Sequence, residues 1–132
     1  GLPGVNSARF SCSGSGREAG RGLLDHRNMA KLLELMKNVP DEKRTARFVC
    51  CLCLAQPGRI LFETSGMLEG RIIRKQQGEQ GFGYDPIFYV PELGKTAAEL
   101  ESEQKNQISH RGRAMKNLKP FLKNLVEKKL DI

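Results

Sequence analysis

The stretch "KNQISHRGRA", residues 105–114, places three hydrogen-bonding side chains in a row at Ser109, His110 and Arg111. A segment of helical periodicity follows, so Ser109 is predicted to cap a helix and the next two residues to occupy its first turn. The free N–H groups and the positive dipole end of a helix favour an anion or a polarised carbonyl there. Arginine offers donors only, whereas histidine can donate or accept. A purine keto oxygen would suit these donors; a capped helix with exposed basic residues is the alternative.

A second candidate is the glycine-rich loop "GEQGFGYDP", residues 78–86. Its glycines permit backbone conformations closed to other residues, and their order differs from G-x-G-x-x-G, so a dinucleotide fingerprint fails. Phe82 and Tyr84 offer flat faces for stacking, and Pro86 is expected to hold Asp85 in an extended conformation. Such a loop could grip a nucleobase, and an ordinary loop with two anchoring aromatics is the alternative.

Composition limits the class of protein. The 132 residues are 39% apolar, enough for one domain spanning residues 1–132, and no apolar run has membrane-spanning length. We therefore expect a cytoplasmic protein with no membrane partner. The whole chain has a net charge of +7. Residues 105–129 alone carry the same net charge, because they hold eight Lys or Arg residues and one acid. This helix lacks the interleaved aromatics of a nucleic-acid binder, so we do not expect nucleic acid as a partner.

The cysteines do not suggest a disulfide framework. Three of the four lie in the apolar stretch "ARFVCCLCLA". Cys50 and Cys53 form a C-x-x-C, but positions three apart on a strand point to opposite faces and could not share a metal. We expect buried thiols in a reducing compartment.

The elements that would position these candidates follow from periodicity and turn signals. Residues 11–22 are predicted to be a mobile loop, and Asp25 to cap a helix that stops at Pro40. Residues 45–55 are apolar on both alternating faces, which predicts a central strand buried on two sides. A meander of further strands is expected after the turn at "QPGR".

The later part of the chain carries equally local signals. "ILFETSG" and "MLEGRIIR" are predicted to be two strands with a bulge at Gly66 or Gly70, and "PIFYVP" a short strand. Thr96 and Glu99 fit a capping box that opens a short helix. Pro120 is expected to kink or break the last helix. The residues predicted for the inner face of that helix are Ala114, Met115, Leu118, Phe121, Leu122, Leu125 and Val126.

The segments "FGYDPIFYVP", "GKTAAEL" and "KNQISHRGRA", in this order and spacing, resemble the inosine triphosphate pyrophosphatase family. "GLPGVNSARF", "NMAKLLELMKNVP" and "RTARFVCCLCLA" are also similar to that family, so the resemblance covers essentially the whole chain. It implies an α/β fold, with a mixed sheet and flanking helices in two lobes around a nucleotide cleft. It also implies a homodimer that hydrolyses ITP, dITP or XTP to the monophosphate and pyrophosphate with Mg²⁺, cleaning the nucleotide pool.

The resemblance assigns roles residue by residue. Phe82 matches the residue that stacks on the base, with Tyr84 and Asp85 in the same pocket. Lys31 matches a lysine that could contact phosphate, and a solvated helix lysine is the alternative for it. The residues that match the base-recognition group, with donors toward the 6-keto edge, are Lys105, Ser109, His110 and Arg111.

Two family motifs are absent from the 132 residues: Ser/Thr-x-Asn-x-x-Lys, which grips the triphosphate, and Asp-Asp-Ser-Gly, which supplies metal ligands and activates water. The chain begins about where the family continues after Asp-Asp-Ser-Gly. We therefore expect this chain to represent the C-terminal two-thirds of the fold, without the first strand and helix, with no catalytic residue or Mg²⁺ ligand, and to be inactive alone. The alternative function is an inert purine-nucleotide-binding or oligomerisation module.

Overall fold

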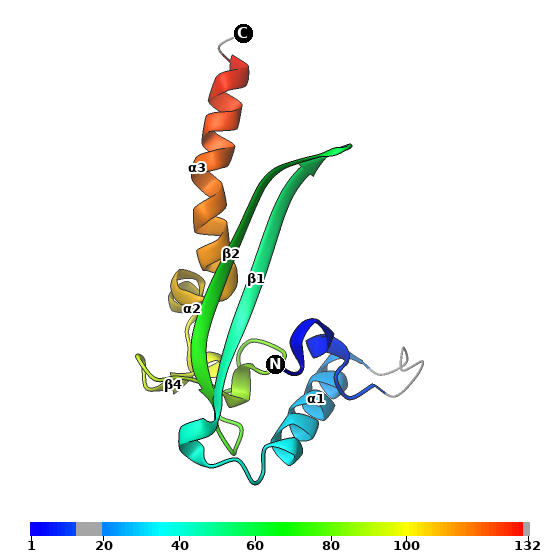
Figure 1. Ribbon diagram of the computed structural model, residues 1–132. Helices are drawn as coiled ribbons and strands as arrows, with labels where there is room; N and C mark the ends of the chain where they lie inside the picture. Colours follow the sequence, from blue (N-terminus) through cyan, green and yellow to red (C-terminus); the bar gives the residue numbers. More distant parts are fainter. Residues whose placement is uncertain (13–19, 131–132) are drawn as a thin grey trace. The chain divides into compact units, whose positions relative to one another are not determined.

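The computed structural model describes residues 1–12 and 20–130 as a mixed α/β protein, which confirms the predicted fold class (Figure 1). The described residues form two compact units, one of residues 1–46 and 70–100 and one of residues 47–69 and 101–132. The expectations of a single domain and of two lobes stay predictions. None of the described helices is both long and apolar enough to cross a membrane.

The elements follow one another along the chain as α-helices, 3-10 helices and strands. The α-helices are α1 (Arg21–Leu35), α2 (Ser102–Ile108) and α3 (His110–Leu130). The strands are β1 (Thr45–Gln56), β2 (Arg59–Ile72), β3 (Phe88–Val90) and β4 (Lys95–Thr96). The 3-10 helices are η1 (Gly4–Arg9), η2 (Asp41–Lys43), η3 (Asp85–Ile87) and η4 (Ala97–Glu99).

The strands form the predicted meander, in the order β1-β2-β3-β4. β3 pairs antiparallel with β2 through Ile72 opposite Phe88, and with β4 through Tyr89 opposite Thr96. The prediction of two strands broken by a bulge is wrong, because β2 runs unbroken through Gly66 and Gly70. These glycines leave room for packing instead: a Cβ on Gly70 would lie 2.5 Å from the ring of Phe88.

β1 alternates between exposed and half-buried side chains, so the prediction of a strand buried on both faces is wrong. Its exposed face carries Val49, Cys51 and Cys53, and β1 lies at the end of the described sheet. The expectation of buried thiols fails for Cys51 and Cys53, although all four cysteines of the chain are unpaired, as expected. An apolar run does not tell whether one face or both are covered, since covering depends on segments distant in sequence.

The core of the unit formed by residues 1–46 and 70–100 gathers around β3 and η4. Its fully buried apolar side chains include those of Met29, Ile87, Phe88, Val90 and Leu100. The predicted capping box is present at the start of η4, where the Thr96 N–H donates to Glu99 Oε1 at 2.9 Å. A local motif of this kind satisfies two helix-end donors without help from the rest of the fold.

Helix α1 begins at Arg21, so the prediction that Asp25 caps it is wrong. Asp25 lies in the second helical turn. Residues 11–22, predicted to be a mobile loop, lie mostly outside the described residues, and Arg21 and Gly22 belong to the helix. The helix ends at Leu35, before Pro40.

Helix α3 continues through Pro120, so the prediction of a break there is wrong. The helix packs along the β1–β2 hairpin of the same unit (Figure 1). The rings of Phe62 and Phe121 are stacked there, with their centroids 4.7 Å apart. This packing offsets the loss of one backbone donor at the proline. Ala114 is fully buried, but Met115 and Val126 are exposed, against the prediction for the inner face. Each follows an inward-facing residue and lies about 100° further around the helix.

Candidate functional site

The aromatic loop, residues 78–86, takes the backbone conformation that its glycines predict. Gly78, Gly81 and Gly83 all have positive φ angles, at 87°, 81° and 63°. Asp85 is wrongly predicted as extended: it begins the 3-10 helix η3, whose first turn accommodates Pro86 because proline at a helix start lacks only a donor that would be unpaired.

The loop leaves the Phe82 ring exposed and turns the two residues after Gly83 inward. Phe82 is 47% exposed, whereas Asp85 is only 5% exposed and its Oδ2 accepts the Phe82 N–H at 3.1 Å. The guanidinium carbon of Arg21 lies 5.7 Å from the centroid of the Phe82 ring, within the range of a cation–π contact. The exposed aromatic face is suited to stacking on a base.

Tyr84 anchors the loop to the start of the chain. Its hydroxyl donates to the carbonyl oxygen of Ser7, in η1, at 2.7 Å. Burial, with the negative charge of Asp25 as the second cause, raises the pKa of Tyr84 to about 12. The phenol therefore acts as a neutral hydrogen-bond donor at physiological pH.

Helix α1 contacts both the loop and the N-terminal segment. Asp25 Oδ2 accepts the N–H of Gly83 at 2.9 Å. Asn28, 2% exposed, donates through Nδ2 to the Ala8 carbonyl and accepts the Ser11 N–H at Oδ1. The helix is thus held to the segment before it by buried polar contacts.

Lys31, the predicted phosphate contact, takes part in the same attachment. Its Nζ donates to the carbonyl of Phe10 at 2.6 Å and lies 4.5 Å from the centroid of the Phe10 ring. A lysine ammonium has three donors, so this contact leaves capacity for an anion.

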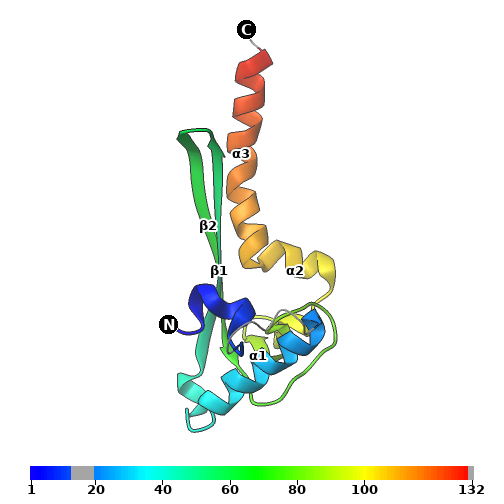
Figure 2. The same ribbon diagram turned by 90° about the vertical axis from the view of Figure 1, so that its right-hand side faces the viewer.

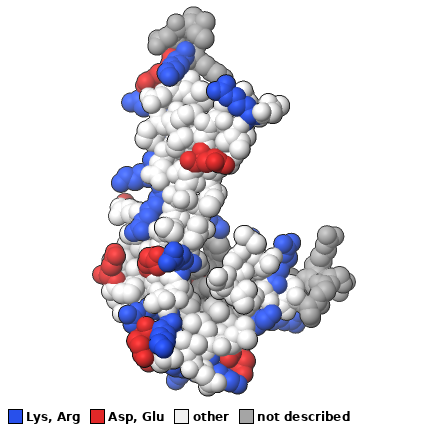
Figure 3. Space-filling view, in the orientation of Figure 1, with Lys and Arg blue, Asp and Glu red and all other residues white. Residues whose placement is uncertain are grey.

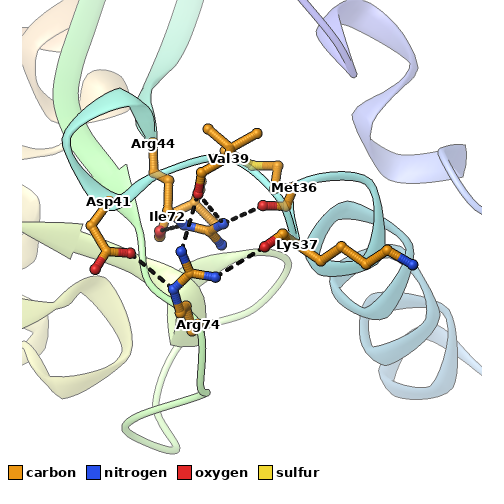
Figure 4. Close-up of polar contacts among 7 residues, drawn as sticks. All are labelled: Met36, Lys37, Val39, Asp41, Arg44, Ile72 and Arg74. Atoms are coloured by element: carbon orange, nitrogen blue, oxygen red, sulfur yellow. Dashed lines mark hydrogen bonds and ion pairs between the residues drawn. The ribbon is translucent and has the colours of Figure 1, made fainter.

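Two arginines hold the segment that leaves α1 (Figure 4). Arg44 is 2% exposed and donates from Nε to the Ile72 carbonyl at 2.8 Å. Arg74 donates from Nε to Asp41 at 2.8 Å. Further donors of the pair reach the carbonyls of Met36, Lys37 and Val39. Burial, and secondarily the charge of Arg74, lowers the pKa of Arg44, while Asp41 opposes that shift.

The entrance of α3 is built as the sequence predicts. Ser109 closes α2 by donating its N–H to the Lys105 carbonyl at 2.8 Å, and opens α3 by accepting the Gly112 N–H at Oγ, 2.9 Å away. His110 and Arg111 therefore lie in the first turn. Figure 2 shows the corner at which α2 meets α3.

Close packing fixes this entrance. The rings of His110 and Phe48 have centroids 5.0 Å apart. A Cβ on Gly66 would lie 2.2 Å from the His110 carbonyl oxygen and 2.6 Å from the Ala114 nitrogen, so only glycine lets β2 come this close to α3. Arg113 then donates to the Met67 carbonyl at 2.6 Å and fastens the helix to the same strand.

The structure thus brings together the predicted site residues in two sets. Phe82, Tyr84 and Asp85 share one loop, and Lys31 lies on α1 in the same unit; Lys105, Ser109, His110 and Arg111 share the α2–α3 corner of the other unit. Sequence reasoning missed the contact of Asp25 with Gly83, because a helix-start aspartate has a simpler local explanation as a cap.

The described residues do not fit a magnesium site. Within residues 1–12 and 20–130, no group of three or more His, Cys, Asp or Glu lies close enough to hold a metal. The half-buried carboxylate of Asp25, on α1, and the buried carboxylate of Asp85, in the aromatic loop, already accept backbone N–H groups. On the face shown in Figure 3, Lys and Arg side chains are dispersed among acidic and uncharged ones.

Comparison with known proteins identifies the class of protein to which this fold and these residues belong. The model of the Ham1 family matches residues 1–121, and the chain belongs to this family. It is similar to the dITP/XTP pyrophosphatases of Desulforamulus reducens, at 49% identity over 95% of this chain and 58% of the relative, and of Escherichia coli, at 47% identity over 94% and 60%.

Solved structures agree with this assignment. The Ham1 protein of Staphylococcus aureus matches 94% of this chain and 59% of its own, with a TM-score of 0.80 and 41% identity. That of Coxiella burnetii matches 93% and 59%, with a TM-score of 0.79 and 40% identity. The chain thus spans somewhat less than two thirds of the length of these relatives.

Proposed function

We propose that the complete product of the gene encoding this chain hydrolyses non-canonical purine nucleoside triphosphates, ITP, dITP and XTP, to the monophosphate and pyrophosphate. The observation that carries this proposal is the near 50% identity, over almost the whole chain, to proteins named dITP/XTP pyrophosphatase. The two sets of site residues described above support it, because stacking and keto recognition are what such substrates require.

Each set is proposed to make its own kind of contact. Phe82 stacks on the purine, with Tyr84 and Asp85 supporting its loop, and Lys31 contacts phosphate. The first turn of α3 supplies donors to the 6-oxygen, through Arg111 and His110 with Ser109 and Lys105 beside them. The 6-amino group of adenine would leave such donors unpaired, at about 1–3 kcal/mol for each buried group.

Arg111→Ala tests the base-reading role. In the complete gene product it should reduce the ratio of kcat/KM for ITP to that for ATP by roughly tenfold, about 1.4 kcal/mol. Lys123→Ala is the control, because Lys123 is exposed on the same helix and makes a long ion pair with Glu127, at 3.9 Å. Both are measured at one salt concentration. An equal loss for both nucleotides would show that Arg111 does not read the base.

Mg²⁺, a homodimer and a cytoplasmic location complete the proposal. They rest on the family resemblance, and no step is assigned to the metal, since the described residues offer no ligand set for it. Pyrophosphate release from ITP with and without Mg²⁺ tests the cofactor. Sedimentation equilibrium tests the dimer: a monomer at every concentration would contradict it.

A further inference from the structure

The backbone on either side of the Phe82 Cα is held by two carboxylates. The Phe82 N–H donates to Asp85 Oδ2 at 3.1 Å, and the next N–H, that of Gly83, donates to Asp25 Oδ2 at 2.9 Å. These N–H groups belong to the two peptide planes that flank Phe82. Because a residue has only two soft backbone dihedrals, fixing both planes fixes the direction in which its side chain leaves the chain.

The two acceptors differ in origin. Asp85 is three residues from Phe82, so its bond belongs to the local turn. Asp25 is 58 residues from Gly83 and comes from α1, so its bond ties the loop to another element of the same unit. Charge-assisted hydrogen bonds to carboxylates are stronger than neutral ones, which makes this tie a firm one.

Helix α1 is itself a fixed platform for Asp25. Asn28, one turn further along, is buried and makes two hydrogen bonds to the segment 8–11. Lys31 adds a bond to the Phe10 carbonyl, and Arg44 holds the Met36 carbonyl just beyond the helix. Because α1 fixes the position of the Asp25 carboxylate, the Gly83 N–H can reach it in one conformation of the loop only, and the hydrogen bond favours that conformation.

We propose that Asp25 is a positioning residue for purine binding, which acts by holding the Gly83 N–H and so presenting the Phe82 ring in its stacking orientation. This inference rests on the proposed function, because it takes Phe82 to be the residue that stacks on the base. A pre-ordered ring gains affinity because the loop loses less freedom on binding. Lys31, the proposed phosphate contact, contacts Phe10 and not the aromatic loop, so we expect a ligand without a base to be insensitive to the loss of the Asp25 contact.

The test compares affinities of the 132-residue chain for ITP and for tripolyphosphate, which lacks a base. The variants are Asp25→Ala, which removes the acceptor, and Asp25→Asn, which keeps the shape and one neutral acceptor. Glu34→Gln is the matched control, since Glu34 lies on α1 with an exposed side chain that pairs with Lys37. Asp25→Ala should weaken ITP binding by about tenfold, within the range for losing one stacked base, and Asp25→Asn by less. Tripolyphosphate binding and the Glu34→Gln variant should be unchanged.

Two further readouts separate positioning from general support. The amide resonance of Gly83 should shift, and its hydrogen exchange accelerate, in both Asp25 variants but not in Glu34→Gln. In a double-mutant cycle, Asp25→Ala should add little to Phe82→Ala, because a contact that acts only through Phe82 has nothing left to position.

The outcomes distinguish the two proposals. If Phe82→Ala weakens ITP binding and neither Asp25 variant does, the positioning role is wrong and the stacking role stands. Additive losses in the cycle, or equal losses for ITP and tripolyphosphate, would also overturn the positioning role. If the wild-type chain and Phe82→Ala bind ITP equally, the stacking role of Phe82 fails, and the inference about Asp25 fails with it.

Discussion

At the scale of single residues, Tyr84 shows how the aromatic loop depends on charge. Its phenol is half-buried, donates to the Ser7 carbonyl and lies near Asp25. Burial and, second, the Asp25 charge both disfavour the phenolate, so the pKa rises to about 12 from an ordinary value of about 10. The Tyr84 hydroxyl therefore stays protonated, and remains a hydrogen-bond donor, between about pH 10 and 12, where an exposed tyrosine would ionise.

This shift predicts a loss of stability at high pH. Between about pH 10 and 12 the unfolded chain loses the Tyr84 proton and the folded chain keeps it, so the stabilisation is complete below pH 10 and lost as the pH approaches 12. In a Tyr89→Phe variant, phenolate absorbance should report late ionisation of Tyr84 in the native state and ordinary ionisation in urea. Adding Asp25→Asn should lower the native value. Ionisation near pH 10 in the folded chain would contradict the prediction.

At the scale of elements, the approach of β2 to α3 depends on Gly66. Gly66→Ala would drive a Cβ into the His110 carbonyl and the Ala114 nitrogen, both backbone atoms that cannot rotate away. We expect a loss of about 1–3 kcal/mol in the free energy of unfolding, measured in urea, as for other overpacked sites. The first turn of α3 should move with it.

Gly22→Ala is the comparison for this change. Gly22 lies within α1, and a Cβ there would meet no atom within 4 Å. The substitution should stabilise the chain by up to about 1 kcal/mol, because alanine loses less freedom than glycine in a helix. Equal stabilities for the two variants would show that the close approach at Gly66 is not tight.

The same elements show what could be predicted from sequence. The Ser109 cap and the Thr96–Glu99 capping box were predictable because each is completed within a few residues. The single strand β2 was not predictable, because its two glycines make room for the Phe88 ring and the His110 carbonyl, and both residues are remote in sequence. The partner of Asp25 lies 58 residues away, so no local pattern could reveal it.

At the scale of the whole molecule, the two compact units interleave along the chain. Residues 1–46 and 70–100 form one, and residues 47–69 and 101–132 the other, so neither is a continuous segment. The aromatic loop and the entrance of α3 are close in sequence yet belong to different units. Each unit is therefore complete only when two separate stretches of the chain come together.

The alternating exposure of β1 has a chemical consequence. Cys51 and Cys53 lie on its exposed face, whereas Cys50 is half-buried on the opposite one and Cys12 is half-buried elsewhere. A short pulse of a maleimide should therefore alkylate two thiols well before the other two, and peptide mapping by mass spectrometry should place the early adducts on Cys51 and Cys53. Adducts forming first on Cys50 would mean that the strand presents its other face. The same pair of thiols makes the chain prone to intermolecular disulfides in air, so that reductant, more than salt or nucleotide, should decide whether purified samples stay homogeneous.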